Sequence, residues 1–200
     1  MINKIDSIYM INLPYRQDRL EYQIKQFESL GLPMFEIIRP VEVEDSKRFL
    51  NKSIRSCYLT HLKIIEKIID SKEFCIILED DAQIINIDLI KITLENLVKE
   101  KEWDMFYFYH HNKLFEYYTI KGKLSNTHAY IINPLSAKKI YKHLIVNKQK
   151  IEDGKFGYSH IDQAYIHCVH SKVKLVHANQ MLIKQNKNFS SDIEWHKSDS

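Results

Sequence analysis

Short apolar runs alternate with amphipathic segments along this chain, and this order constrains its fold more than any other feature. Ser7–Leu13 is rich in β-branched and aromatic residues and stops at Pro14, which predicts a buried strand. Apolar residues then recur at helical spacing over 20–27, and Gly31 stands where such a helix would end. A strand followed by a helix in this way is the repeating unit of an α/β fold.

The same alternation continues to residue 178. Further strands are predicted at Met34–Arg39, Phe74–Leu78, Trp103–Tyr109, Tyr117–Lys121, Ala129–Ile132 and Val173–Ala178. Apolar stripes predict further helices over 58–69, 87–97 and 137–144, and another that begins at Ser159. We therefore expect a Rossmann-like α/β fold, with a mixed, mainly parallel sheet flanked by helices. In such sheets, ligands bind beyond the carboxyl ends of the strands.

The composition is that of one globular domain. A chain of 200 residues with 44% hydrophobic content suffices for one core, so we expect a single domain over 1–200, with a loosely held polar tail from about Lys184. The formal net charge of +3 and the lack of basic blocks disfavour nucleic acid as a partner.

The sequence shows neither a signal peptide nor a membrane-spanning run. The three cysteines, Cys57, Cys75 and Cys168, are scattered in apolar patterns, which indicates buried free thiols in a reducing compartment. We therefore expect a cytoplasmic protein. Usage rich in Ile, Lys and Asn fits a bacterium or a large DNA virus equally well.

Three consecutive carboxylates, Glu79, Asp80 and Asp81, follow the apolar run 74–78. In an extended chain Glu79 and Asp81 point to one side, about 6–7 Å apart, and Asp80 points to the other. Two oxygen ligands on one side suit Mg²⁺ or Mn²⁺ held together with substrate phosphates. The alternative is a charged turn before the helix near Asn86, because acids are favourable at a helix N-terminus. The triplet alone leaves both interpretations open.

The sequence offers few ways to bind phosphate. Only four glycines are present, and neither GxGxxG nor GxxxxGK[ST] occurs, which excludes the two common glycine-rich phosphate loops. Arg16 and Arg19 stand one helical turn apart after the first strand, where two guanidinium groups can bind phosphate together. Solvated arginines on a helix face are the alternative interpretation.

Four blocks of the chain form a combination more specific than any one of them. They are INLPYRQDR at 11–19, SCYLTH at 56–61, LEDD at 78–81 and THAYII at 127–132, with a weaker SSDI at 190–193. In this order and spacing they resemble glycosyltransferase family 25, which includes lipooligosaccharide-biosynthesis enzymes and procollagen galactosyltransferases. The resemblance spans residues 8–193, and Ser56 and Thr60 stand where the family has Gly and Ser.

The resemblance implies a GT-A fold, a UDP-sugar donor (usually UDP-galactose) and a divalent metal, Mn²⁺ or Mg²⁺. By position, Glu79 and Asp81 would bind the metal, with Asp80 beside them on the donor side. The other donor-binding positions that the resemblance implies are Asn12, Arg16, Arg19, Thr60 and His61.

Histidines lie close to several of the predicted strand ends. His61 follows the apolar stripe of its helix closely enough for a buried imidazole to be the alternative to donor binding. His128 precedes a predicted strand and would either contact a sugar hydroxyl of the donor or belong to the core. For His110 and His111, acceptor contact or simple exposure is expected rather than a metal role.

An inverting transfer needs a carboxylate that takes the proton of the acceptor hydroxyl as it attacks the anomeric carbon. Asp162 is the first candidate, although Ser159 and Asp162 also have the spacing of a helix-capping box. Asp192 is the second candidate, either as the base or as a further metal or donor contact.

These observations lead to one hypothesis with rivals. We expect a metal-dependent inverting glycosyltransferase that moves a sugar from a UDP-sugar to a hydroxyl of a glycan or a hydroxylated protein side chain. Galactose is the first candidate for the sugar. UDP-glucose or another UDP-sugar is the alternative donor, and a non-catalytic member that binds nucleotide-sugar or glycan is the alternative class. Metal-dependent phosphoryl transfer is disfavoured, because no second acidic cluster has convincing spacing.

Overall fold

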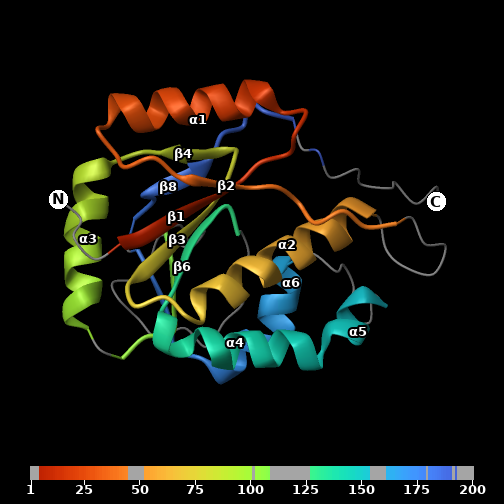
Figure 1. Cartoon of the computed structure of the whole chain (residues 1–200). Coiled ribbons are helices and arrows are strands. Elements are labelled where there is room, and N and C mark those ends of the chain that lie inside the picture. Colours follow the sequence, from red (N-terminus) through yellow and green to blue (C-terminus); the bar gives the residue numbers. More distant parts are fainter. Residues whose placement is uncertain are drawn as a thin grey trace.

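The computed structural model describes residues 5–44, 52–100, 102–108, 127–153, 161–178, 180–190 and 192. A six-stranded sheet of order β2-β1-β3-β6-β5-β7 forms its centre, and a two-stranded sheet pairs β4 with β8 (Figure 1). The strands are β1 (Ile5–Ile11), β2 (Glu36–Ile38), β3 (Phe74–Glu79), β4 (Ala82–Ile84), β5 (Met105–Tyr107), β6 (Ala129–Ile132), β7 (Leu175–His177) and β8 (Ile183–Gln185).

The large sheet is mixed and mainly parallel, as predicted. β1 pairs in parallel with β2 and β3, and β5 pairs in parallel with β7. β6 runs antiparallel between β3 and β5. The amino end of β6 therefore meets the carboxyl ends of β3 and β5, which brings Thr127 and His128 to the edge of the sheet where Glu79 lies.

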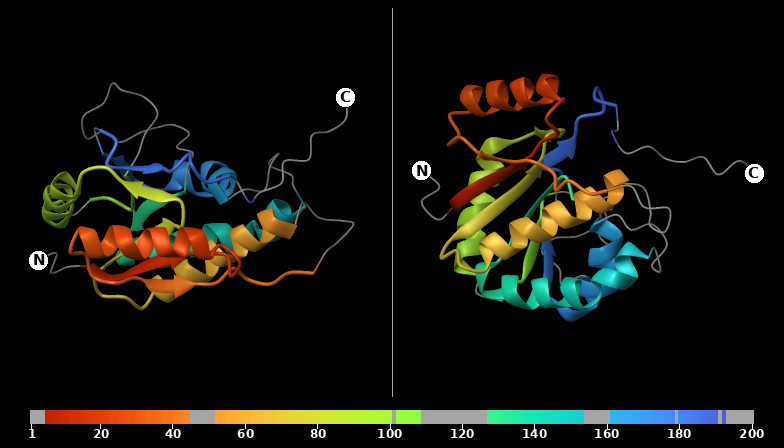
Figure 2. Two further views of the ribbon diagram at one scale, coloured as in Figure 1. Left: turned by 90° about the horizontal axis from the view of Figure 1, so that it is seen from above. Right: turned by 45° about the vertical axis from the view of Figure 1, so that its right-hand side comes forward.

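Helices cover both faces of the sheet (Figures 1 and 2). They are α1 (Gln17–Ser29), α2 (Lys52–Ile68), α3 (Ile87–Lys99), α4 (Pro134–Val146), the short α5 (Lys148–Glu152) and α6 (Ile161–Ala164), which continues as a π-helical turn at Tyr165–Val169 and a 3₁₀ turn at His170–Lys172. One apolar cluster joins α2, α4 and α6 to one face, and a second joins α1, α3 and β8 to the other. The prediction of an α/β sheet flanked by helices is confirmed.

Local sequence signals explain several helix ends. The Asn86 side chain accepts a hydrogen bond from the Leu89 N–H at 3.0 Å and caps α3, and Asn133 caps α4, whose first residue is Pro134. Gly31, predicted to end the first helix, follows α1 with φ of 60°, a left-handed conformation that glycine adopts without strain.

The small sheet was not predicted. β4 and β8 have three residues each and lie about one hundred positions apart in sequence, so no local pattern announces their pairing. The tail was expected to be loosely held from about Lys184. In the structure Lys184 belongs to β8, and the Asn186 N–H donates to the Asp81 carbonyl at 2.7 Å. The predicted strand Tyr117–Lys121 lies outside the described residues.

Among the residues that the structure describes, no helix is both long enough and apolar enough to cross a membrane.

We expect the central strand to dominate stability. Ile77 of β3 is fully buried, so Ile77→Ala should lower the free energy of unfolding by about 2–5 kcal/mol, through lost burial and the cavity left behind. Ile92 on α3 is 52% exposed, and Ile92→Ala is the matched control, expected to change the stability by no more than about 0.5 kcal/mol. Urea denaturation measures both, and equal effects would contradict the assignment of the core.

Candidate functional site

The three carboxylates lie where the central strand leaves the sheet. β3 ends at Glu79, and Asp80 and Asp81 form the turn into β4. The alternation expected for an extended chain therefore stops at Glu79. The expected arrangement, with Glu79 and Asp81 on one side and Asp80 on the other, does not hold, because Glu79 contacts His61 and Thr127 whereas Asp80 and Asp81 both lie near Arg19. Each of the three acids instead has its own set of partners.

Asp80 is held by the segment that follows β1. The Asn12 Nδ2 donates to Asp80 Oδ2 at 2.8 Å, and Arg19 Nη1 donates to Asp80 Oδ1 at 2.7 Å. All three side chains are buried. Burial raises the pKa of Asp80 and the ion pair with Arg19 opposes that rise. Asp80 thus connects β3 to α1, and its two oxygens are engaged inside the protein.

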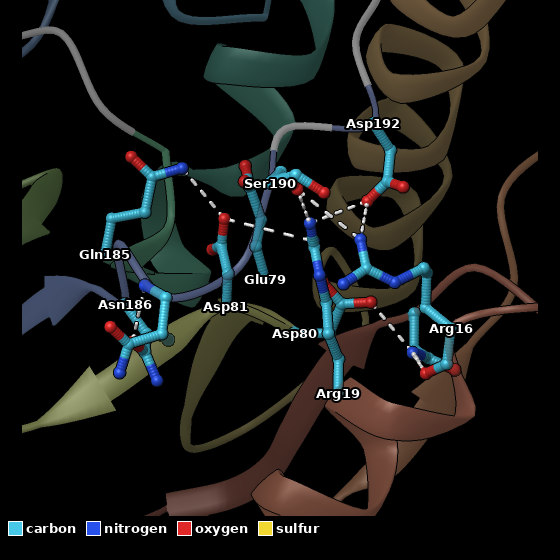
Figure 3. Close-up of polar contacts among 12 residues, drawn as sticks. Arg16, Arg19, Glu79, Asp80, Asp81, Gln185, Asn186, Ser190 and Asp192 are labelled. Atoms are coloured by element: carbon cyan, nitrogen blue, oxygen red, sulfur yellow. Dashed lines mark hydrogen bonds and ion pairs between the residues drawn. The ribbon is translucent and has the colours of Figure 1, made fainter.

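The two carboxylate oxygens of Asp81 differ in their hydrogen bonding. Gln185 Nε2 donates to Asp81 Oδ2 at 2.8 Å, whereas Asp81 Oδ1 is buried and has no hydrogen-bond partner in the described part of the chain (Figure 3). Burial, and next the negative charge of Glu79, raise the pKa of Asp81 to about 6. An acceptor oxygen that is buried, unpaired and close to a second carboxylate is a site that a cation would stabilise.

Glu79 faces the α2 side of the sheet. It accepts a hydrogen bond from the Thr127 hydroxyl at 2.8 Å, and its Oε1 lies 3.5 Å from His61 Nε2. Burial alone would raise the pKa of Glu79, but His61 and Thr127 outweigh it and hold the pKa below the ordinary value. Glu79 therefore keeps its negative charge at neutral pH, next to Asp81.

Arg16 and Arg19 converge on the chain that follows β8 (Figure 3). The Asp192 Oδ2 lies 2.5 Å from Arg16 Nη1 and 2.6 Å from Arg19 Nη2, so one carboxylate oxygen bridges both guanidinium groups. The Ser190 carbonyl also accepts from Arg19, and Phe189 lies against both arginines with centroid distances of 5.8 and 5.5 Å. Both predicted phosphate ligands are thus paired with the chain's own carboxylate.

Helix α1 also fixes the turn through its glutamines. Gln23 Nε2 donates to the carbonyls of Asp80 and Ala82 at 2.9 and 2.7 Å. The Gln26 Oε1 accepts a hydrogen bond from the Ile84 N–H at 2.9 Å. These bonds satisfy backbone groups of the turn and of β4, so α1 sets where the acids lie.

His61 is fully buried between α2 and the sheet. Its Nδ1 lies 2.7 Å from the Tyr130 hydroxyl, which in turn lies 2.9 Å from the Tyr165 hydroxyl. Its Nε2 faces Glu79 and has no hydrogen-bond partner within the described part of the chain. His61 therefore joins the site through Glu79, on the side of the sheet opposite Arg19.

Thr60 lies in a different set of contacts from the acids. Its hydroxyl donates to the Ser56 carbonyl at 2.7 Å and accepts from the Val41 N–H at 2.9 Å. The Ser56 hydroxyl donates to the Val41 carbonyl at 2.6 Å. These bonds tie the chain after β2 to α2, which is a structural role at one of the positions predicted to bind the donor.

The remaining predicted positions lie around this centre. His128 is buried, and its Nε2 lies 3.4 Å from the Ile183 carbonyl of β8. Asp162 opens α6 and is half-buried, and its Oδ1 accepts from the Gln163 N–H at 2.8 Å. His110 and His111 lie outside the described residues.

Three side chains of this centre were not predicted to belong to it. Thr127 and Gln185 bond to Glu79 and Asp81, and Cys57 lies one helical turn before His61. Burial, then the charges of Glu79 and Asp162, raise the pKa of the Cys57 thiol well above its ordinary value. The spacing of Cys57 and His61 was visible in the sequence, whereas nothing near Gln185 indicates its partner.

A scan against protein-family models and a search of curated proteins each found no match to this chain. The resemblance to glycosyltransferase family 25 therefore stays a hypothesis that depends on the sequence blocks and on the geometry of the residues within them.

The raised pKa of Asp81 predicts how stability depends on pH in metal-free solution. The folded pKa of about 6 exceeds the ordinary 3.8, a difference worth about 3 kcal/mol. The folded state holds the proton more tightly, so this contribution is present below pH 4 and is lost as the pH rises through 6. Asp81→Asn should therefore gain up to about 3 kcal/mol relative to wild-type protein between pH 4 and pH 7.

Denaturant unfolding across this pH range, with a chelator present, measures the difference. Asp70→Asn, at an exposed carboxylate after α2, is the matched control and should stay within about 0.5 kcal/mol of wild-type protein. A difference between wild-type and Asp81→Asn that does not change with pH would contradict the environment described for Asp81.

Proposed function

We propose that this chain is a metal-dependent inverting glycosyltransferase with a GT-A arrangement. It moves a sugar from a UDP-sugar to a hydroxyl of a glycan or of a hydroxylated protein side chain. Galactose is the first candidate for that sugar. The observation that carries the proposal is the buried Oδ1 of Asp81, which has no partner among the described residues and lies near the charged Glu79 at the carboxyl end of the central strand. Ligand sites of open α/β sheets lie beyond this edge.

The residues present fit a hard divalent cation. Glu79 and Asp81 supply carboxylate oxygens, the ligands that Mn²⁺ and Mg²⁺ accept when they are bound together with phosphates. A cation between them would cancel the repulsion that raises the pKa of Asp81. When bound, the ion would act as a Lewis acid that neutralises the charge developing on the diphosphate leaving group.

Arg16 and Arg19 supply the positive charge for the donor phosphates. A single Asp192 oxygen already bridges them, and a phosphate oxygen has the same charge and the same acceptor chemistry. Donor binding would therefore replace Asp192 between the guanidinium groups. Arg19 would remain fixed by Asp80, with its Nε buried and without a hydrogen-bond partner among the described residues.

Asp162 is the carboxylate that we assign to accept the proton of the acceptor hydroxyl. Of the two candidates, Asp192 already has its Oδ2 in two ion pairs. Asp162 lies on the side of the sheet that Glu79 faces, since its charge acts on Cys57, close to Glu79. Positioning of the acceptor and stabilisation of charge on the leaving group would supply most of the rate enhancement.

Two rivals remain. UDP-glucose or another UDP-sugar would use the same site. A non-catalytic protein that binds nucleotide-sugar or glycan is favoured by one observation, that the two arginines are paired with the chain's own carboxylates Asp18 and Asp192.

Hydrolysis of a panel of UDP-sugars in the presence of Mn²⁺ tests the proposal. Turnover should require Mn²⁺, and Asp81→Asn should lower kcat by at least about 10²-fold, the scale expected when one charge-stabilising group is lost. Asp70→Asn should retain full activity. Turnover with none of the donors, together with no Mn²⁺-dependent binding of UDP, would sink the proposal, and UDP binding without turnover would favour the non-catalytic rival.

Removing the charge of Asp192 should strengthen UDP binding. Asp192→Asn frees both guanidinium groups for phosphate, and we expect the Kd for UDP with Mn²⁺ to fall by about 10-fold, equivalent to about 1.4 kcal/mol. Asp88→Asn, at a carboxylate whose side chain is 84% exposed, is the control. Calorimetric titration measures both, and weaker UDP binding by Asp192→Asn would show that Asp192 supports the donor site instead of competing for it.

A further inference from the structure

Three potential metal ligands of different elements meet on the α2 side of the sheet. Cys57 and His61 are four residues apart on α2, so their side chains lie on one face of the helix, one turn apart. Glu79 reaches the same place from the end of β3. The thiol, imidazole and carboxylate ligand atoms all lie within 4.8 Å of one another.

The imidazole of His61 is the unexplained member of this cluster. It is fully buried, yet its Nε2 has no hydrogen-bond partner among the residues that the structure describes. If Nδ1 carries the proton and donates to Tyr130, the lone pair of Nε2 faces the Glu79 carboxylate. If Nε2 carries the proton, the 3.5 Å to Glu79 Oε1 exceeds the usual length of a hydrogen bond. A proton on Nε2 therefore gives His61 only a long contact with the Glu79 carboxylate, and a cation between Nε2 and Glu79 would replace this contact with two direct bonds.

We infer that Cys57, His61 and Glu79 form a site for a thiophilic divalent ion, with Zn²⁺ as the first candidate. This site lies next to the hard-ion site proposed for Glu79 and Asp81 and shares Glu79 with it. Thiolate, imidazole and carboxylate are all common zinc ligands. Three protein ligands leave the fourth position of a tetrahedral ion for water or another small donor.

The surroundings of His61 match those of metal-binding histidines. Such residues bond their second ring nitrogen to a fixed partner, which sets the orientation of the ring. Here the Tyr130 hydroxyl occupies that place at 2.7 Å from Nδ1, and Tyr165 holds Tyr130 in turn. On the carboxylate side, the Thr127 hydroxyl donates to Glu79 at 2.8 Å and orients it.

The ligand set separates this ion from Mn²⁺ and Mg²⁺. A hard ion prefers oxygen ligands and competes poorly for a thiol, whereas Zn²⁺ binds thiolate and displaces its proton. Glu79 belongs to both sets of ligands, so the two sites lie side by side, whereas Cys57 and His61 belong only to the zinc site and Asp81 only to the hard-ion site. This inference does not require that the chain transfer sugars.

Zinc binding to the purified, chelator-treated protein tests the inference. Calorimetric titration with ZnCl₂ should give one ion per chain, and titration with Co²⁺ should give the near-ultraviolet absorption of a thiolate-to-metal charge transfer. Cys57→Ser should weaken Zn²⁺ binding by at least about 10-fold, because the loss of even an outer partner costs about 10–100-fold. The charge-transfer absorption should disappear in this variant.

Two further variants control for folding and for the neighbouring site. Cys168→Ser removes a buried thiol outside the cluster and should leave both signals unchanged. Asp81→Asn should also leave Zn²⁺ binding within about 3-fold of wild-type protein, a change below about 1 kcal/mol. No binding of Zn²⁺, equal binding by wild-type and Cys57→Ser, or loss of binding in Asp81→Asn would each overturn the inference.

Discussion

The buried ion pair between Asp80 and Arg19 is the interaction on which the rest of the site depends. It joins the end of the central strand to α1, and Asn12 completes it from the end of β1. Removing one partner of a buried pair leaves an uncompensated charge and costs about 3–5 kcal/mol. Arg19 and Asn12 together use both oxygens of Asp80. The middle acid of the triplet therefore has a structural role, while its neighbours stay available for chemistry.

The three acids differ because the turn after β3 gives each a different environment. Glu79 faces the imidazole of His61 and stays charged. Asp81 keeps one oxygen that no described residue pairs with, and its pKa is raised by burial and by Glu79. Such a raised pKa lowers stability at neutral pH, which a folded protein tolerates where the group has a function. A bound cation would remove this cost and would leave the Asp80 ion pair unchanged.

Much of the fold could be predicted from the sequence, and less of the site. Strands such as Ala129–Ile132 are continuous apolar runs, and the pattern that marks them is local. The pairing of Asp192 with Arg16, and of Gln185 with Asp81, joins segments about one hundred or more residues apart, so no local signal predicts it. The side on which each acid points could not be predicted either, because the strand ends one residue before Asp80.

The central claim is that Glu79 and Asp81 hold a hard divalent ion. Electron paramagnetic resonance of Mn²⁺ in the presence of UDP measures this most directly, because free and bound Mn²⁺ give different signals. We expect one bound Mn²⁺ per chain in wild-type protein and in Cys57→Ser, and none in Asp81→Asn. Mn²⁺ bound equally by wild-type protein and Asp81→Asn, or by neither, would contradict the account.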